Sequence, residues 1–384
     1  MLYNNLIHDK KIINTFTSYV NNQKLPHAII FYGSEGRGKF LHAIELCNMI
    51  LSRNNDIGIV EKKIKTNQHE NINYILPLPK SKSIKKDDSA LKALSSSDLE
   101  NIQSELKNKL GNPYYKISID KANTILINSI RDIKKKISLS NINNNWNIYI
   151  ILDAEKLCYP RTESANALLK ILEEPNENNL FILITSNISQ MLETITSRCS
   201  KQYFSKLLQE DINKFITNNY NIDSEQADII SNLSNGNITT ANKIASNYDT
   251  YIHKITDIID LLFNFNLSKW QKIFSKLKDK SEIIFLLNLV SMYFNDMILF
   301  KTLQSKRKIR FSFLHSDIIK YTKKYRASKF DKILDIINET KKNLTQNVYH
   351  PLLITTFYLE IHQVLSNQSK KKMNYNQNPY LING

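Results

Sequence analysis

The sequence predicts an α/β domain built on a parallel sheet, followed by a small helical segment and an all-α C-terminal part. Three observations support this prediction. A buried apolar run at 28–32 leads through a glycine-rich loop into a helical pattern. Two more apolar runs, at 147–152 and 180–185, flank an amphipathic helix, which implies a parallel, right-handed crossover. From about residue 251 onward, apolar residues recur at helical spacing.

Length and charge limit the function classes. A chain of 384 residues has room for two or three domains with cores of their own. The net charge of +16 suggests an acidic partner, and nucleic acid is the usual one. Lysine outnumbers arginine 44 to 8, and asparagine and isoleucine are abundant, so part of this charge is a background of surface lysine.

The cysteines and the apolar runs point to a cytoplasmic protein without a membrane span. Cys47, Cys158 and Cys199 are odd in number and far apart, so they indicate neither a disulfide framework nor a zinc module. The N-terminus lacks the continuous apolar core of a signal peptide. The longest apolar run, 283–300, contains polar residues that suit a packed helix better than a bilayer.

The loop after the first predicted strand has the spacing of a phosphate-binding loop. Its sequence is GSEGRGKF, residues 33–40, and it holds three of the seven glycines of the chain. Glycines let successive N–H groups face one phosphate cluster, and Lys39 adds a positive charge at the start of the next helix. Phe40 stands where a hydroxyl would hold magnesium, so magnesium binding is doubtful. A chance glycine turn is the alternative interpretation.

The region between this loop and the next strong strand is less regular. Residues 72–79 read as an extended segment closed by prolines, and 80–97 as a polar surface insertion. A short helix is expected at 99–110. A second helix should open at Ile119 and place isoleucines on one face and basic residues on the other. The default interpretation is that these basic residues form a solvated helix face. The minority interpretation is that they contact a phosphate backbone.

The strand that begins at residue 147 ends on an aspartate, Asp153. Nucleotide-hydrolysing enzymes with a phosphate loop hold magnesium through a carboxylate at this place. An aspartate that caps the next turn is an equally good interpretation. Glu155 is a poor water-activating base while the strand continues, because adjacent strand positions point to opposite faces.

The chain after this strand leads to a charged residue, Arg198. Thr162 is placed to cap an amphipathic helix that Pro175 stops, and the strand 180–185 follows. A short helix then leads into Ser197-Arg198-Cys199. Arg198 is either a solvated helix-end cation, favoured there by the helix dipole, or a finger that reaches into the phosphate site of a neighbouring subunit.

Two motifs carry a family resemblance. SANALLKILEEP at 164–175 and LFILITSNISQMLETITSRC at 180–199 resemble the bacterial clamp-loader subunits of the AAA+ superfamily, and among them the delta-prime type. The resemblance covers about 25–58 and 118–250 well, and the C-terminal part weakly through 346–352.

The resemblance implies roles for particular residues. Gly33, Gly36, Gly38 and Lys39 fall on the Walker A motif, Asp153 on the Walker B aspartate, and Thr185 or Ser186 on the polar sensor. Arg198 falls on the arginine that, in this family, reaches the ATP of an adjacent tau/gamma subunit. The second sensor position falls on Thr239, with no arginine nearby in the sequence.

The departures from the family pattern predict a chain that does not hydrolyse ATP by itself. Phe40 replaces the serine or threonine whose hydroxyl binds magnesium. Ala154 replaces the glutamate that acts as general base, and Thr239 replaces the arginine of the second sensor. Phosphoryl transfer depends on all three. ATP or ADP binding is therefore expected to be weak at best. The family's zinc module has no counterpart, because the segment that would hold it contains no cysteine.

The resemblance also divides the chain. We expect an AAA+ domain at 1–205 with an insertion at about 80–112, a helical lid at 206–248, a collar at 249–366 and a disordered tail at 367–384. The segment 301–330 contains ten basic residues and a single acid, Asp317. This stretch could contact DNA or an acidic subunit, but a solvated basic surface is the default.

The sequence thus predicts a non-hydrolysing, delta-prime-like member of a clamp-loader ring, with Arg198 as the group that it supplies. The expected partners are tau/gamma-type and delta subunits, the sliding clamp and primer-template DNA. Two other functions stay open at this stage: an ATP-hydrolysing tau/gamma-type subunit, and a DNA-binding module on a degenerate nucleotide fold. ATP turnover by the chain alone would favour the first, and strong salt-dependent DNA binding without partners the second.

Overall fold

A computed structural model describes residues 1–139, 145–277, 279–303, 309–346 and 348–366. The tail predicted at 367–384 lies outside these residues. The chain divides into two compact units. The first contains Met1–Asn221 and Ser234–Lys243, and the second contains Ile222–Leu233 and the chain from Ile244 onward. The finer division into an AAA+ domain, a lid and a collar stays a prediction.

The first unit is built on the parallel sheet that the sequence predicts. Its five strands lie in the order β2-β3-β4-β1-β5, and every neighbouring pair is parallel. The strands are β1 (Ala28–Tyr32), β2 (Ile72–Ile75), β3 (Asn147–Ile151), β4 (Asn179–Thr185) and β5 (Ser200–Tyr203). Because β4 and β5 both pair with β1, the loops that follow these three strands meet at one edge of the sheet.

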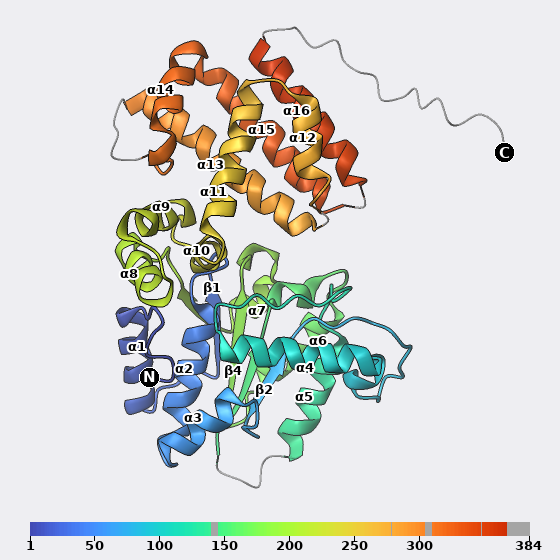
Figure 1. The fold of residues 1–384 in the computed structure, drawn as a ribbon. Helices are drawn as coiled ribbons and strands as arrows, with labels where there is room; N and C mark the ends of the chain where they lie inside the picture. The colour runs from blue at the N-terminus through green and yellow to red at the C-terminus, as the bar shows by residue number, and fades with distance from the viewer. Residues whose placement is uncertain (140–144, 278, 304–308, 347, 367–384) are drawn as a thin grey trace, which may run out of the picture. The chain divides into compact units, whose positions relative to one another are not determined.

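Helices cover both faces of this sheet (Figure 1). Ten helices belong wholly or partly to the first unit among its described residues: α1 (Lys10–Asn21), α2 (Lys39–Leu51), α3 (Ile57–Lys65), α4 (Ser96–Gly111), α5 (Ile127–Leu139), α6 (Glu163–Glu173), α7 (Glu193–Thr196), α8 (Gln209–Asn219), α9 (Ser224–Ser234) and α10 (Ile238–Ala245). Alternate strand residues point to opposite faces and so build two cores. Ile29 and Phe31 pack with α1 to α4, and Ala28 and Ile30 with α5 to α7.

Two expectations for the region before β3 are wrong. The helix expected from Ile119 begins at Ile127, because Lys121 has a φ of 59° and Thr124 forms a bridge with Leu78. A left-handed residue cannot belong to an α-helix. The polar segment 80–97 is not exposed throughout, as a surface insertion would be, since Ala90, Ala93 and Leu94 are buried. The short helix expected at 99–110 is confirmed as part of α4, and the insertion bounds of about 80–112 stay a prediction.

The second unit is helical, as the periodicity predicts. Its remaining helices are α11 (Tyr248–Phe263), α12 (Leu267–Phe274), α13 (Lys280–Leu303), α14 (His315–Lys324), α15 (Ala327–Leu344) and α16 (His350–Ser366). The buried Trp270 stacks on Tyr358 and donates its indole N–H to the Ile354 carbonyl at 3.2 Å, which joins α12 to α16. Asp296 is buried in α13 and pairs with Arg310 at 2.8 Å, which explains an aspartate inside an apolar helix.

Helix α13 is long and apolar enough to cross a membrane by length and composition, with a mean hydropathy of 1.8 over its best window. Half of that window is buried within the protein. The helix packs against α11, α14 and α15, so these contacts are those of a core helix. The absence of a membrane partner stays a prediction.

Candidate functional site

The glycine-rich loop connects β1 to α2, as a phosphate-binding loop does. Gly33, Gly36 and Gly38 all have positive φ angles, of 134°, 67° and 79°. A Cβ atom at Gly33 would lie 2.5 Å from the Phe204 carbonyl oxygen, so the close approach of β1 and the residue after β5 requires glycine there. The sequence therefore folds locally as its spacing predicts.

The middle of this loop is bound to the segment before α10. The Gly36 carbonyl accepts a hydrogen bond from the Ile238 N–H at 3.0 Å. The side chain of Arg37 is buried, and its guanidinium donates to the carbonyls of Gly236 and Asn235. The contact is so close that a Cβ atom at Gly36 would lie 1.8 Å from Asn237 Oδ1. Two of the loop's residues are thus fixed by contacts within the protein.

Lys39 is also engaged by its own loop. Its ammonium group donates to the carbonyls of Gly33 and Ser34, the latter at 2.7 Å. Burial lowers the pKa of Lys39 to about 8, and the nearby Glu35 partly opposes this shift. Lys39 therefore stays largely protonated at neutral pH, and an incoming phosphate would compete with two carbonyl groups for it.

A half-buried lysine, Lys109 of α4, lies beside Phe40, the residue that stands where a hydroxyl would bind magnesium. Its Nζ atom is 5.0 Å from the centre of the Phe40 ring, and it donates to the carbonyls of Pro113, at 2.8 Å, and Tyr115. Burial lowers the pKa of Lys109 to about 8, and the charge of Asp153 opposes this shift. A phenyl ring thus stands at the sequence position where a metal-binding hydroxyl is usual, and an ammonium group lies beside it.

Replacing Lys109 by methionine should change how stability depends on pH. The unfolded lysine has a pKa near 10.5 and the folded one about 8, so between these values only the unfolded chain binds the proton. Raising the pH through this window therefore favours the folded state of the parent. We expect its free energy of unfolding in urea to rise relative to Lys109→Met between about pH 8 and 10.5. A difference that does not change with pH would contradict this assignment.

The carboxylates at the end of β3 lie beyond the strand. β3 ends at Ile151, and Asp153 has a left-handed φ of 48°. Its exposed carboxylate makes no capping bond and lies 3.4 Å from Lys156 Nζ. Glu155 accepts a hydrogen bond from Thr185 Oγ1 at 2.7 Å. Because the strand has already ended, strand alternation does not decide where Glu155 points, and its carboxylate faces the polar residue that ends β4.

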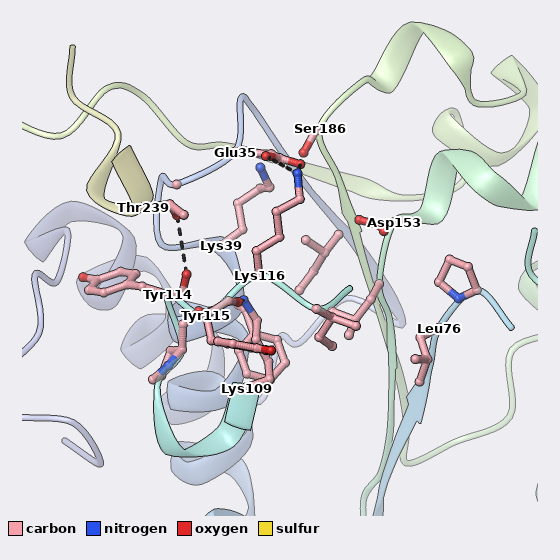
Figure 2. Close-up of a pocket in the computed structure, with 17 residues that line it drawn as sticks. Glu35, Lys39, Leu76, Lys109, Tyr114, Tyr115, Lys116, Asp153, Ser186 and Thr239 are labelled. Carbon is pink, nitrogen blue, oxygen red and sulfur yellow. Dashed lines mark hydrogen bonds and ion pairs between the residues drawn. The ribbon is translucent and has the colours of Figure 1, made fainter. Parts of the chain in front are cut away.

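A cavity of about 140 Å³ lies between these groups. Figure 2 shows Lys39, Asp153 and Ser186 around it, with Lys116 paired to Glu35 at 2.9 Å. Gly36, Phe40 and Lys109 line it as well, whereas Thr185 does not. Sites for small organic ligands usually measure about 300–1,000 Å³. Of the six predicted nucleotide residues, Gly36, Lys39 and Asp153 line this space and Gly33, Gly38 and Thr185 do not. The space is smaller than is usual for a small organic ligand.

The second-sensor position, Thr239, also lines this cavity. Its hydroxyl donates to the Tyr114 carbonyl at 3.4 Å, which Figure 2 shows as a dashed line. A threonine here offers no positive charge to a phosphate. The sequence pattern identifies Thr239 but neither Lys109 nor Lys116, because both lysines lie in the irregular region before β3.

Arg198 is held at the surface, away from this cavity. It lies between α7 and β5, beside the buried Cys199. One guanidinium nitrogen is 2.9 Å from the Glu173 carboxylate, and another donates to the Thr194 carbonyl at 2.9 Å. The Arg198 and Glu173 side chains are 38% and 43% exposed. The bond to Thr194 is the ordinary contact of a helix-end cation. The exposure leaves the guanidinium accessible to a ligand from outside.

The described residues offer no ready metal site. No group of three or more histidine, cysteine, aspartate or glutamate side chains gathers within them. The cysteines are separate, with Cys47 and Cys199 buried and Cys158 half-buried.

Comparison with known proteins identifies the family of this chain. The family model described as DNA polymerase III, delta subunit, matches residues 8–208, just over half of the chain. The delta' subunit of Bacillus subtilis is 23% identical over 354 residues, which cover 88% of this chain and 91% of that protein. The gamma subunit of Buchnera aphidicola from Schizaphis graminum is 34% identical over 130 residues.

That match covers 33% of this chain and 35% of the gamma subunit, so the chain spans about a third of the length of this relative. Among solved structures, a gamma subunit-related protein from Thermotoga maritima aligns with a TM-score of 0.40 and 13% identity, covering 91% of this chain and 99% of that one. The family match extends from the N-terminal helix through the phosphate loop, β3, Arg198 and β5. The chain belongs to the DNA polymerase III delta-subunit family.

Proposed function

We propose that this chain acts as the delta-prime subunit of a DNA polymerase III clamp loader, and that Arg198 serves as an arginine finger in the ATP site of a neighbouring subunit. Its family and its similarity to a delta' subunit over most of both chains support the first part. The geometry of Arg198 supports the second. The chain would contribute to hydrolysis without hydrolysing ATP itself.

The observation that carries the finger role is the exposed guanidinium beside Glu173. Arginine binds phosphate oxygens through two parallel hydrogen bonds, and its charge stabilises the negative charge that develops in phosphoryl transfer. An exposed ion pair contributes at most about 1 kcal/mol. Arg198 can therefore exchange the Glu173 carboxylate for a phosphate at small cost, while the buried Cys199 fixes the backbone beside it.

The chain's own loop supports a non-hydrolysing role. Lys39 and Arg37 already donate to backbone carbonyls, and Phe40 lies beside Lys109. The cavity has a volume of about 140 Å³. ATP binding would require several of these contacts to break, so we assign no magnesium or nucleotide cofactor to this site.

In this role the chain would work with tau/gamma-type and delta subunits, in the cytoplasm. The ring would place the sliding clamp on primer-template DNA, and hydrolysis at the neighbour's site would depend on Arg198. The domains at 1–205, 206–248 and 249–366 would then be the AAA+ domain, the lid and the collar of this subunit.

ATP turnover by the purified chain tests this function. We expect no appreciable hydrolysis by the chain alone, because its site lacks the side-chain hydroxyl that binds magnesium and the arginine of the second sensor. Mixing it with a tau/gamma-type partner should raise the partner's turnover. The measurement is phosphate release with and without the partner. Appreciable turnover by the chain alone would contradict the proposal and favour an ATP-hydrolysing subunit.

The similarity to a gamma subunit is the observation that favours that second candidate. It covers 130 residues only. Phe40, Ala154 and Thr239 oppose it, since each replaces a group that ATP hydrolysis needs.

A further inference from the structure

Six basic residues follow one another on α14, on α15 and in the turn between them. We call them the α14–α15 cation cluster: Lys320, Lys323, Lys324, Arg326, Lys329 and Lys332. Lys320, Lys323 and Lys324 have the spacing i, i+3 and i+4, which puts them on one face of α14. Five members of the cluster are exposed, and Lys329 is half-buried. Both helices belong to the second unit and are labelled in Figure 1.

Two side chains of the cluster, one from each helix, lie over the same aromatic ring. The Nζ atoms of Lys324 and Lys329 lie 5.2 and 5.5 Å from the centre of the Tyr325 ring. Burial, then the charges of Arg326 and Lys332, lower the pKa of Lys329. The two helices therefore bring these cations close enough to repel one another.

The charge of the cluster is not neutralised by ion pairs within the described residues. None of the six side chains forms an ion pair there, and Asp317 and Asp331 are the only acids between 309 and 332. Lys329 has a structural task, since it donates to the Leu365 carbonyl at 2.7 Å. Lys301, which is not a member of the cluster, donates in the same way to the Thr322 carbonyl at 2.7 Å. The other five members of the cluster have no such partner.

Some basic residues elsewhere on the described surface are neutralised by ion pairs, whereas others, such as Lys24 and Lys107, form none. Lys92, Lys116 and Arg198 each pair with a carboxylate at less than 3 Å, as is usual where surface charge is balanced. Like charges held together without a partner cost energy, and an external polyanion relieves this repulsion. The cluster therefore has the properties of a binding surface for an anion.

We propose that the α14–α15 cation cluster binds the phosphate backbone of DNA. Five of its six members are lysines, whose ammonium groups read charge rather than the planar geometry of a carboxylate. Contacts of this kind give binding without sequence preference. Interfaces between proteins usually depend on aromatic or apolar anchors. None of the large exposed hydrophobic side chains of the described residues lies between 309 and 332, and Tyr321 is buried.

The proposal goes beyond the finger role and does not rest on it, because it concerns the second unit and the chain without partners. The experiment uses the full chain and a short fluorescein-labelled DNA duplex, with binding followed by fluorescence anisotropy across a range of salt concentrations. The test variant changes Lys320, Lys324 and Lys332 to glutamine. The matched control changes the exposed Lys24, Lys62 and Lys107 to glutamine, which removes the same charge.

We expect the test variant to bind the duplex at least about tenfold more weakly at low salt. Its slope of log K against log salt should fall by about three, one for each phosphate contact that is lost. The control variant should keep both values near those of the parent. A Lys→Arg triple variant at the three test positions should bind like the parent, since it keeps the charge.

Equal losses in the test and control variants would overturn the proposal, because binding would then reflect overall charge. A test variant that binds DNA like the parent would also overturn it. If that variant instead failed to join the other subunits, the cluster would be a surface for an acidic protein. None of these outcomes touches the role of Arg198, which the ATP measurements test separately.

Discussion

Changing Arg198 to alanine is expected to reduce ATP turnover at the partner's site by about 10³-fold, the lower end of what arginine fingers contribute. The reason is that the guanidinium, which now lies 2.9 Å from Glu173, would no longer reach the phosphates in the assembled ring. The measurement is DNA-stimulated, single-turnover hydrolysis with a tau/gamma-type partner. Binding of ATP by the partner should change much less than its hydrolysis.

Arg161→Ala is the matched control for this prediction. Arg161 is an exposed arginine of the same unit that lies 3.7 Å from Glu163. It should leave turnover unchanged, since it belongs to no proposed site. Arg198→Lys should recover only part of the activity, because lysine keeps the charge but loses the two-pronged hydrogen bond. If Arg198→Ala and Arg161→Ala hydrolysed ATP equally fast, Arg198 would be an ordinary surface cation.

Changing Gly36 to alanine should destabilise the first unit by about 2 kcal/mol, from the positive φ and a lost helix cap. The new methyl group would overlap Asn237 Oδ1, which lies 1.8 Å from the ideal Cβ position. That oxygen accepts hydrogen bonds from the N–H groups of Thr239 and Thr240 and so caps α10. Urea unfolding measures the cost, and hydrogen exchange at 234–243 should quicken.

Gly111→Ala is the control for this variant. Gly111 ends α4, has nothing within 4 Å of an added Cβ atom and lacks a positive φ. Alanine should therefore be neutral or slightly stabilising there. If Gly36→Ala were equally neutral, the phosphate loop would not be fastened to α10 in solution.

The elements with strong local patterns could be predicted from the sequence. β1 has the predicted bounds, β4 begins one residue earlier than expected, and α13 encloses the predicted apolar run. A strand that is buried on both faces, or a helix that is apolar around its whole circumference, produces a continuous apolar run in the sequence. The sequence predicts too early a start for the helix α5, because no residue type before it indicates that Lys121 has a left-handed backbone conformation.

The candidate site was predictable only in part, for a physical reason. Glycine spacing reveals the loop at 33–40 because the backbone conformation itself demands glycine. The contacts of Arg37 with Gly236 and of Lys109 with Phe40 join residues that are far apart in the sequence. Such contacts depend on tertiary packing, which leaves no local signal. The sequence therefore suggested a weakened nucleotide site, and the structure adds the side chains that fill it.

The central claim is that this chain acts in a neighbour's ATP site and not in its own. The most direct test compares Arg198→Ala with Asp153→Asn in the same reconstituted assembly. Both side chains are exposed, so neither change should disturb folding. We predict that Arg198→Ala lowers DNA-stimulated hydrolysis at the partner's site by about 10³-fold, while Asp153→Asn leaves hydrolysis unchanged. Loss of hydrolysis in Asp153→Asn with full activity in Arg198→Ala would contradict the claim.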